Sequence, residues 1–122
     1  MNHQRVNKVV ISATATQKLR TLRIRTGITP NVMARAALAL SLNESDQPYA
    51  EEYPADGMEF NAYTLFGDLD VLLTALIKEN NASKKANDES LPEQVRAHIN
   101  RGVDLLYPRV RSLTDVGLLA KK

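Results

Sequence analysis

The order of hydrophobic and polar positions predicts a mainly α-helical chain that begins with one short strand. Residues 6–12, VNKVVIS, are rich in β-branched side chains, which favour a strand. Apolar residues at helical spacing then predict four main helices, over residues 14–26, 30–42, 65–79 and 90–106. The 122 residues are enough for a single domain with a modest core. We therefore expect one mainly α domain over residues 1–122, with four main helices and a short N-terminal strand.

The first two helices have recognisable boundaries. Thr14 is the expected N-cap of the first helix and Gly27 its C-terminal glycine. Thr29 and Pro30 have the residue types that begin a second helix. The stripe expected to be buried in the first helix consists of Ala15, Leu19, Leu22 and Thr26. Ile24 lies nearly opposite that stripe and indicates a second contact surface.

The second helix and the strand both indicate contacts beyond their own segment. Apolar side chains surround the second helix, and its one charged residue is Arg35. A helix of this kind is either the centre of a domain or part of an oligomer interface, and we favour the oligomer. We interpret Arg35 as an internal ion-pair partner. The strand needs a partner from another chain or from a later segment.

The second half of the chain begins with a polar connection. Residues 44–63 form an acidic connecting segment, and residues 43–57, NESDQPYAEEYPADG, predict an extended loop. Residues 64–122 contain the C-terminal helices and a tail. In TLFGDLD, Thr64 is the expected cap of the third helix, with Phe66 and Leu69 in the core. The alternative is that this segment docks a partner subunit. Ser90 and Glu93 form a capping-box pattern for the fourth helix, which Pro108 is expected to stop.

Composition narrows the classes of protein. The chain is 43% hydrophobic and 25% charged, as is usual for globular domains. It has no cysteine, which excludes disulfides, thiolate metal sites and cysteine nucleophiles. No window approaches the roughly 18 apolar residues that a membrane-spanning helix needs. No membrane association is expected, and a cytoplasmic protein is the simplest interpretation.

Charge is distributed in blocks along the chain. Residues 1–43, a basic strand-helix-helix segment, hold seven basic residues and no acid, whereas residues 44–70 hold eight acids and no base. Such asymmetry predicts a surface that faces a polyanion. The alternative is that the two blocks pair with each other in the folded protein.

Catalytic chemistry has little support in the sequence. His98 lies beside the apolar stripe of the fourth helix, where a surface or partly packed histidine is expected rather than a base or ligand. Asp68 and Asp70 resemble a paired-carboxylate metal motif, but acids in a first helical turn also favour the helix dipole. No nucleotide-binding loop or catalytic triad pattern is present. We expect no enzyme activity and no cofactor.

Duplex DNA is the partner that explains the acid-free segment. Lysine and arginine neutralise phosphates and release counterions, which gives affinity without sequence preference. The first aromatic residue is Tyr49, so base stacking on the N-terminal block is less expected than contact with a duplex backbone. The candidate DNA-binding residues are Lys8, Lys18, Arg20, Arg23, Arg25, Lys84 and Lys85.

Residues 9–42 resemble ribbon-helix-helix DNA-binding proteins in their order of strand, helix, GIT turn and helix. That family pairs strands from two chains and lays the ribbon in the major groove. The resemblance implies that Lys8, Val10 and Ser12 or their neighbours face bases. A transcriptional regulator is therefore one alternative function.

A second resemblance spans nearly the whole chain. The segments NKVVIS, LRTLRIRTGITPNVMARAALALSL, GMEFNAYTLFGDLDVLL and HINRGVDLL resemble the DNA sulfur modification protein family DndE. The resemblance implies a non-catalytic accessory subunit of DNA phosphorothioation that binds DNA, nicked duplexes included. It also implies a homo-oligomer, a tetramer, and association with the other modification subunits. The remaining alternatives are a scaffold that binds only proteins and a nuclease that uses Asp68 and Asp70.

Overall fold

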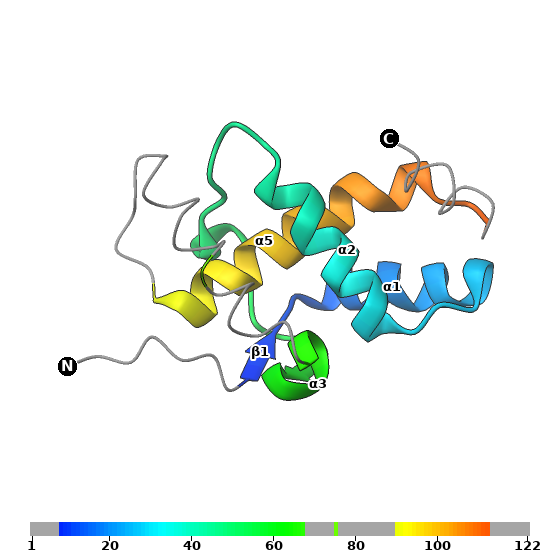
Figure 1. Ribbon diagram of the computed structural model, residues 1–122, viewed down its shortest axis with the longest axis horizontal. Coiled ribbons are helices and arrows are strands. Elements are labelled where there is room, and N and C mark those ends of the chain that lie inside the picture. The colour runs from blue at the N-terminus through cyan, green and yellow to red at the C-terminus, as the bar shows by residue number, and fades with distance from the viewer. Residues whose placement is uncertain (1–7, 68–74, 76–89, 113–122) are drawn as a thin grey trace.

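The computed structural model describes residues 8–67, 75 and 90–112. These residues form four α-helices and two short strands, so the prediction of a mainly α fold is confirmed. The helices are α1 (Ala13–Thr26), α2 (Pro30–Leu42), α3 (Ala62–Phe66) and α5 (Leu91–Leu106), and the strands are β1 (Lys8–Val10) and β2 (Glu59–Asn61). Single 3₁₀ turns lie at Ala50–Glu52 and Tyr107–Arg109. In Figure 1, α2 crosses α5, and α3 lies beside β1.

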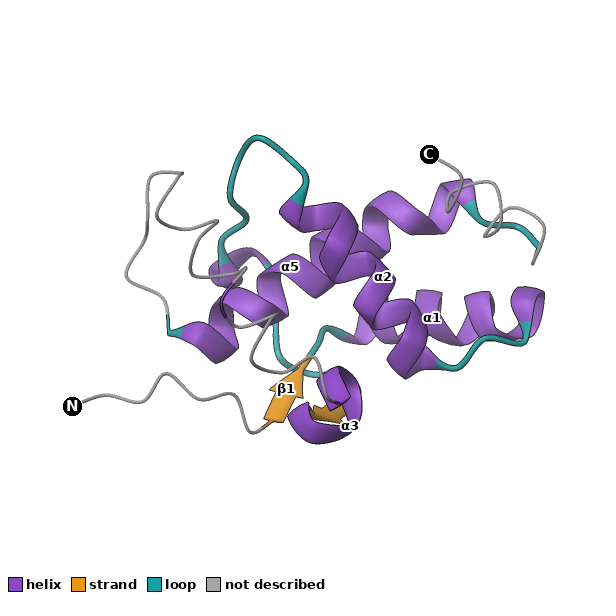
Figure 2. Ribbon diagram, viewed as in Figure 1, coloured by secondary structure: helices purple, strands orange, loops and turns teal. Residues whose placement is uncertain are grey.

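Strand β1 pairs with a later segment of the same chain. It lies antiparallel to β2, with Lys8 opposite Asn61 and Val9 opposite Phe60. Figure 2 shows the strands in orange next to α3. The pairing continues beyond the strands, because Ile11 N–H donates to the Met58 carbonyl at 3.0 Å. Of the two partners left open by the sequence, the later segment is therefore the one observed. The strand-helix-helix order matches the ribbon-helix-helix pattern, but the observed strand pairing is within one chain.

Ser12, and not Thr14, caps the first helix. The Ser12 hydroxyl oxygen accepts the Ala15 N–H at 3.0 Å, and the hydroxyl donates to Asn100 Oδ1 at 2.7 Å. Ser12 is buried by these contacts, so the expectation that it faces DNA bases is wrong. The prediction of Thr14 fails because the tertiary contact with α5 fixes the earlier hydroxyl in place. Gly27 ends the helix at a φ of 78°, as predicted.

The contact between α2 and α5 is the most extensive pairing of helices in the described chain. A Cβ atom on Gly102 of α5 would overlap the backbone of Ala37 on α2. Glycine therefore allows the two helix backbones to approach closely. The predicted bounds of α2 are confirmed, and its buried face consists of Met33, Ala34, Ala37, Leu38 and Ser41.

Helix α5 begins at the predicted capping box. Ser90 Oγ accepts the Glu93 N–H at 3.4 Å, and Glu93 Oε1 accepts the Ser90 N–H at 2.9 Å. These hydrogen bonds lower the pKa of the Glu93 carboxyl, because they favour its charged form. The helix ends at Leu106 as predicted, although Pro108 lies within a 3₁₀ turn that continues the chain.

The middle of the chain differs from its prediction at the third helix. Residues 43–57, predicted as an extended loop, contain one 3₁₀ turn and are followed by strand β2. The helix expected from residue 65 instead begins at Ala62, where Asn61 Oδ1 accepts the Tyr63 and Thr64 N–H groups. Thr64 is therefore inside α3 and is not its cap. Apart from residue 75, the rest of the predicted third helix lies outside the described residues.

Replacement of Gly102 tests the close approach of α2 and α5. We expect Gly102→Ala to lower the free energy of unfolding by about 1–3 kcal/mol, because the added methyl group forces the helix backbones apart. Urea unfolding followed by circular dichroism measures this loss. Gln17→Ala, at an exposed position of α1, is the control and should change stability by less than about 0.5 kcal/mol. Equal stability of the Gly102→Ala variant and the original chain would contradict this packing account.

Candidate nucleic-acid interface

Helix α1 carries the basic surface because only one side of it is buried. Its buried residues include the complete predicted stripe, with Thr16 added, and Leu19 and Leu22 are fully enclosed. Arg20 and Arg23 are exposed on the remaining surface, together with Ile24, which is 86% exposed. We call Lys18, Arg20, Arg23 and Arg25 the α1 basic surface. No acidic residue lies within α1, so nothing on the helix itself offsets their charge.

The basic residues near the end of α1 also have a structural reason to be there. Arg23 and Arg25 lie in its last turn, where positive charge favours the helix dipole. That effect explains a preference for cations at this end of the helix. The helix dipole does not explain why Arg20, one turn earlier, is also basic and exposed.

Lys18 and Arg25 lie on the side of α1 that contacts Tyr107. The Arg25 guanidinium carbon is 4.8 Å from the centre of the Tyr107 ring, and Lys18 Nζ is 5.5 Å from it. Arg25 also donates to the Val110 carbonyl and to the Tyr107 hydroxyl, each at 3.4 Å. No local pattern pointed to Tyr107, because it lies 82 positions from Arg25 along the chain.

Ion pairs already involve two of the predicted DNA-binding residues. Lys18 Nζ lies 2.8 Å from Asp104 Oδ1, and Lys8 Nζ lies 3.7 Å from Glu59 Oε2. Among the ion pairs of the described chain, the Lys8 pair alone joins the N-terminal basic block to the acidic block. Within the described part of the chain, mutual neutralisation of the two blocks is therefore limited to this one exposed ion pair. Lys84 and Lys85 lie outside the described residues.

Arg35 differs from its prediction. It is half-buried on α2, and it has no ion-pair partner among residues 8–67, 75 and 90–112. Its Nε atom is buried without a hydrogen-bond partner in that part of the chain. The expected internal ion pair is thus not observed there.

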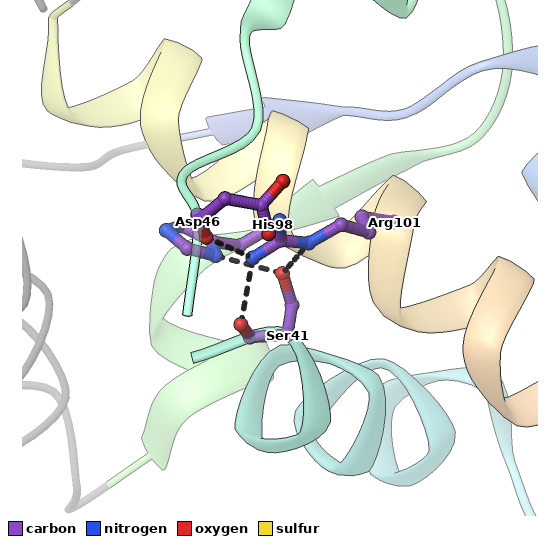
Figure 3. A network of polar contacts seen from close by, with 4 residues as sticks. All are labelled: Ser41, Asp46, His98 and Arg101. Carbon is purple, nitrogen blue, oxygen red and sulfur yellow. Dashed lines mark hydrogen bonds and ion pairs between the residues drawn. The ribbon is translucent and has the colours of Figure 1, made fainter. Parts of the chain in front are cut away.

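His98 belongs to a buried polar network that connects α2, α5 and the loop after α2 (Figure 3). Its Nδ1 is 2.8 Å from Ser41 Oγ, which also accepts the Arg101 Nε–H at 2.9 Å. Arg101 further donates to the Ser41 carbonyl, to Asp46 Oδ1 and to the Asp46 carbonyl, at 2.8, 2.9 and 2.9 Å. His98 is fully buried, so the prediction of a surface or partly packed histidine is wrong. The physical reason is Ser41, a polar partner 57 residues away that makes burial of the imidazole favourable.

This network has the residue types of a catalytic pair but the geometry of a structural one. Ser41 and His98 have no exposed surface, so a substrate cannot reach the hydroxyl. Arg101 donates to the Ser41 oxygen, and the same hydroxyl group shares a second hydrogen bond with His98 Nδ1, whose donor depends on the tautomer of the imidazole. The network joins three segments and leaves the serine oxygen engaged.

Tyr53 lies near the same network. Burial raises the pKa of its phenol, and the carboxylates of Asp104 and Glu52 raise it further. The hydroxyl is therefore protonated at neutral pH and is no candidate for a general base.

The remaining site predictions concern a metal site and the TLFGDLD segment. In the described part of the chain, no group of three or more histidine and acidic residues could hold a metal ion. Asp68 and Asp70 lie outside that part. In TLFGDLD, Leu65 and Phe66 are buried, which agrees with the prediction that Phe66 packs in the core. Tyr63, just before this segment, is 80% exposed. None of the described helices has the length and apolar character needed to cross a membrane.

The comparisons with known proteins agree with the second resemblance. A family model described as "DNA sulphur modification protein DndE" matches residues 8–113. The chain belongs to the DndE family. Among curated proteins, none matches the chain.

Two solved DndE structures have a similar fold. One is DndE from Escherichia coli B7A, described as involved in DNA phosphorothioation modification. It has 24% identity and a TM-score of 0.70, with 84% of this chain and 97% of that chain covered. The other is a glycine-to-lysine double mutant of DndE with 22% identity and a TM-score of 0.67. The match covers 84% of this chain and 98% of that chain. At these identities the likeness supports the fold alone.

A variant of Arg101 distinguishes a structural network from a functional site. We expect Arg101→Lys to lower the free energy of unfolding by about 1–3 kcal/mol, because lysine cannot make the forked contacts to Ser41 and Asp46. Thermal and urea unfolding give the measurement. Arg109→Lys, at an exposed position, is the matched control and should be nearly neutral. An Arg101→Lys variant as stable as that control would refute a stabilising role.

Proposed function

We propose that this chain is a non-catalytic subunit of the DNA phosphorothioation machinery that binds the backbone of duplex DNA through the α1 basic surface. Membership of the DndE family supports the link to DNA sulfur modification. The single observation that carries the DNA contact is the exposure of Arg20 and Arg23 on a helix without any acid. Exposed arginines of this kind attract phosphates without reading bases.

A preference for nicked duplexes is a second part of the proposal. It rests on the family resemblance, together with the lower deformation cost of a duplex that is already interrupted. A curved contact with α1 would then form at less cost on a nicked duplex than on an intact one.

Self-association is a third part of the proposal, and α2 provides the surface. Val32, Ala36 and Ala39 are exposed at helical spacing on the side of α2 that faces away from α5. An apolar face with small residues allows close packing against a second copy of the chain. The tetramer and the association with other modification subunits rest on the family resemblance, and the exposed side of α3 is our candidate for the latter. A cytoplasmic location stays a prediction.

A protein-only scaffold is the second candidate function. The observation that favours it is that Lys8 and Lys18 are already paired with acids. Such a scaffold would direct Arg20 and Arg23 at an acidic partner protein. A ribbon-helix-helix regulator is less favoured, because Ser12 is buried and β1 pairs within its own chain.

The test of the proposed function is binding to labelled nicked and intact duplexes of unrelated sequence across a salt series. We expect binding that weakens steeply with salt, varies little with sequence and is tighter for the nicked duplex. Equal affinity for the two duplexes would remove the nick preference. No binding at low salt would favour the protein-only scaffold.

Neutralising Arg20 and Arg23 tests the placement of the contact. We expect Arg20→Gln with Arg23→Gln to weaken binding to every duplex. The slope of log K against log salt should also fall by about 2, because two phosphate contacts are lost. Fluorescence anisotropy at several salt concentrations gives both quantities.

The matched control lowers the net charge by the same amount elsewhere. Ala55→Glu with Thr64→Glu places two negative charges at exposed positions outside α1. If this control weakens binding as much as the arginine pair does, net charge and not the α1 basic surface determines affinity.

A charge on the outer face of α2 tests self-association. We expect Val32→Glu to convert the oligomer into smaller species, because it places a carboxylate in an apolar contact. Light scattering after gel filtration measures the mass. Tyr63→Glu, at an exposed aromatic position on α3, should leave the mass unchanged. An unaltered mass for Val32→Glu would place the interface on another surface.

A further inference from the structure

A shallow hollow lies between the first half of α1 and the end of α5. Its volume is about 560 Å³, within the range of pockets that hold small ligands. It is lined by Ala13, Thr14, Gln17, Lys18, Thr21 and Tyr107. The hollow thus adjoins the α1 basic surface and shares Lys18 with it.

The lining has the chemistry that a nucleobase requires. Tyr107 supplies the aromatic ring of the hollow, and every base has a flat face that stacks on such a ring. The side chains of Thr14, Gln17 and Thr21 supply uncharged hydrogen-bonding groups for a base edge. Among the described residues, no carboxylate lines the hollow, and Lys18 is the one charged residue of its lining.

Lys18 and Arg25 lie over the ring of Tyr107. A base that stacks on this ring takes their place and leaves both cations beside it, where they can hold its phosphate. Arg25 is 4.8 Å from the ring centre, and the structure uses two of its five N–H donors, on Val110 and Tyr107. Lys18 is bound to Asp104 at 2.8 Å and has two further donors on its ammonium group. A phosphate between Lys18 and Arg25 and a base on Tyr107 could belong to the same nucleotide, in which a single sugar joins them.

We propose that this hollow holds one unpaired nucleotide of the DNA, with its base stacked on Tyr107 and its phosphate bound by Lys18 and Arg25. The proposal rests on the proposed function, since it assumes that α1 contacts DNA. It extends that function from backbone contact to recognition of an unpaired base.

An unpaired nucleotide fits the hollow better than a paired one. The faces of paired bases are covered by their neighbours in the stack, so a ring on the protein surface cannot reach them. Extruding a paired base breaks its pairing and stacking, and the energetic cost is least where the base is already unpaired. The hollow should therefore discriminate between duplexes that differ by one unpaired nucleotide.

The experiment compares an intact duplex, a nicked duplex and a nicked duplex with one unpaired 2-aminopurine nucleotide at the nick. We expect the original chain to bind the unpaired form about fivefold or more tightly than the simple nick, as one stacked base implies. Stacking on Tyr107 should change the 2-aminopurine fluorescence on binding.

Variants of Tyr107 assign this preference to the ring. Tyr107→Leu should lose both the preference for the unpaired form over the simple nick and the fluorescence change. Tyr107→Phe keeps the ring and should retain both. Tyr63→Leu, which removes an exposed tyrosine from α3, is the control, and circular dichroism verifies the fold of each variant.

The possible failures are distinguishable. Salt-dependent binding with equal affinity for the simple nick and the unpaired form would overturn the nucleotide site but leave the proposed function intact. A Tyr107→Leu variant that binds all three duplexes more weakly by the same factor would also overturn the site. The ring would then only support the structure of the surface and would not stack on a base. No binding to any duplex would overturn both proposals.

Discussion

The close contact between α2 and α5 at Ala37 and Gly102 is the constraint on which the rest of the fold depends. With a glycine at the crossing point, the helix backbones approach until no side chain fits between them. That approach brings Asn100 of α5 to Ser12, which starts α1, and Arg101 to the loop that follows α2. One helix pair thereby determines where the first helix begins and how the acidic connecting segment leaves α2. Separation of the pair would disturb both.

The same arrangement explains why α1 is available for binding. Its buried stripe holds it to the core along one side, and the cap at Ser12 fixes its start. Arg20 and Arg23 are then directed outward, while Arg25 and Lys18 meet Tyr107 at the end of α5. The proposed DNA-binding surface therefore consists of one helix and one residue from a distant turn. Its charges are positioned by the core and are only partly neutralised by Asp104.

Local signals predicted much of the fold. The bounds of α2, the glycine that ends α1, the buried stripe of α1 and the capping box of α5 all depend on residues a few positions apart. Errors arose where a tertiary partner decided the outcome. Ser12 caps α1 because Asn100 is beside it, and His98 is buried because Ser41 satisfies its ring nitrogen. Tyr107 was missed in the candidate interface for the same reason, because only folding brings it next to Lys18 and Arg25.

Mapping the amides that respond to DNA tests the central claim most directly. Nuclear magnetic resonance spectra of the labelled protein, recorded during titration with a short duplex, report which backbone sites the DNA approaches. We expect the largest shift changes at residues 17–25 of α1 and at Tyr107, with small changes in α3. Changes confined to α3 or to the outer face of α2, with α1 unaffected, would contradict it.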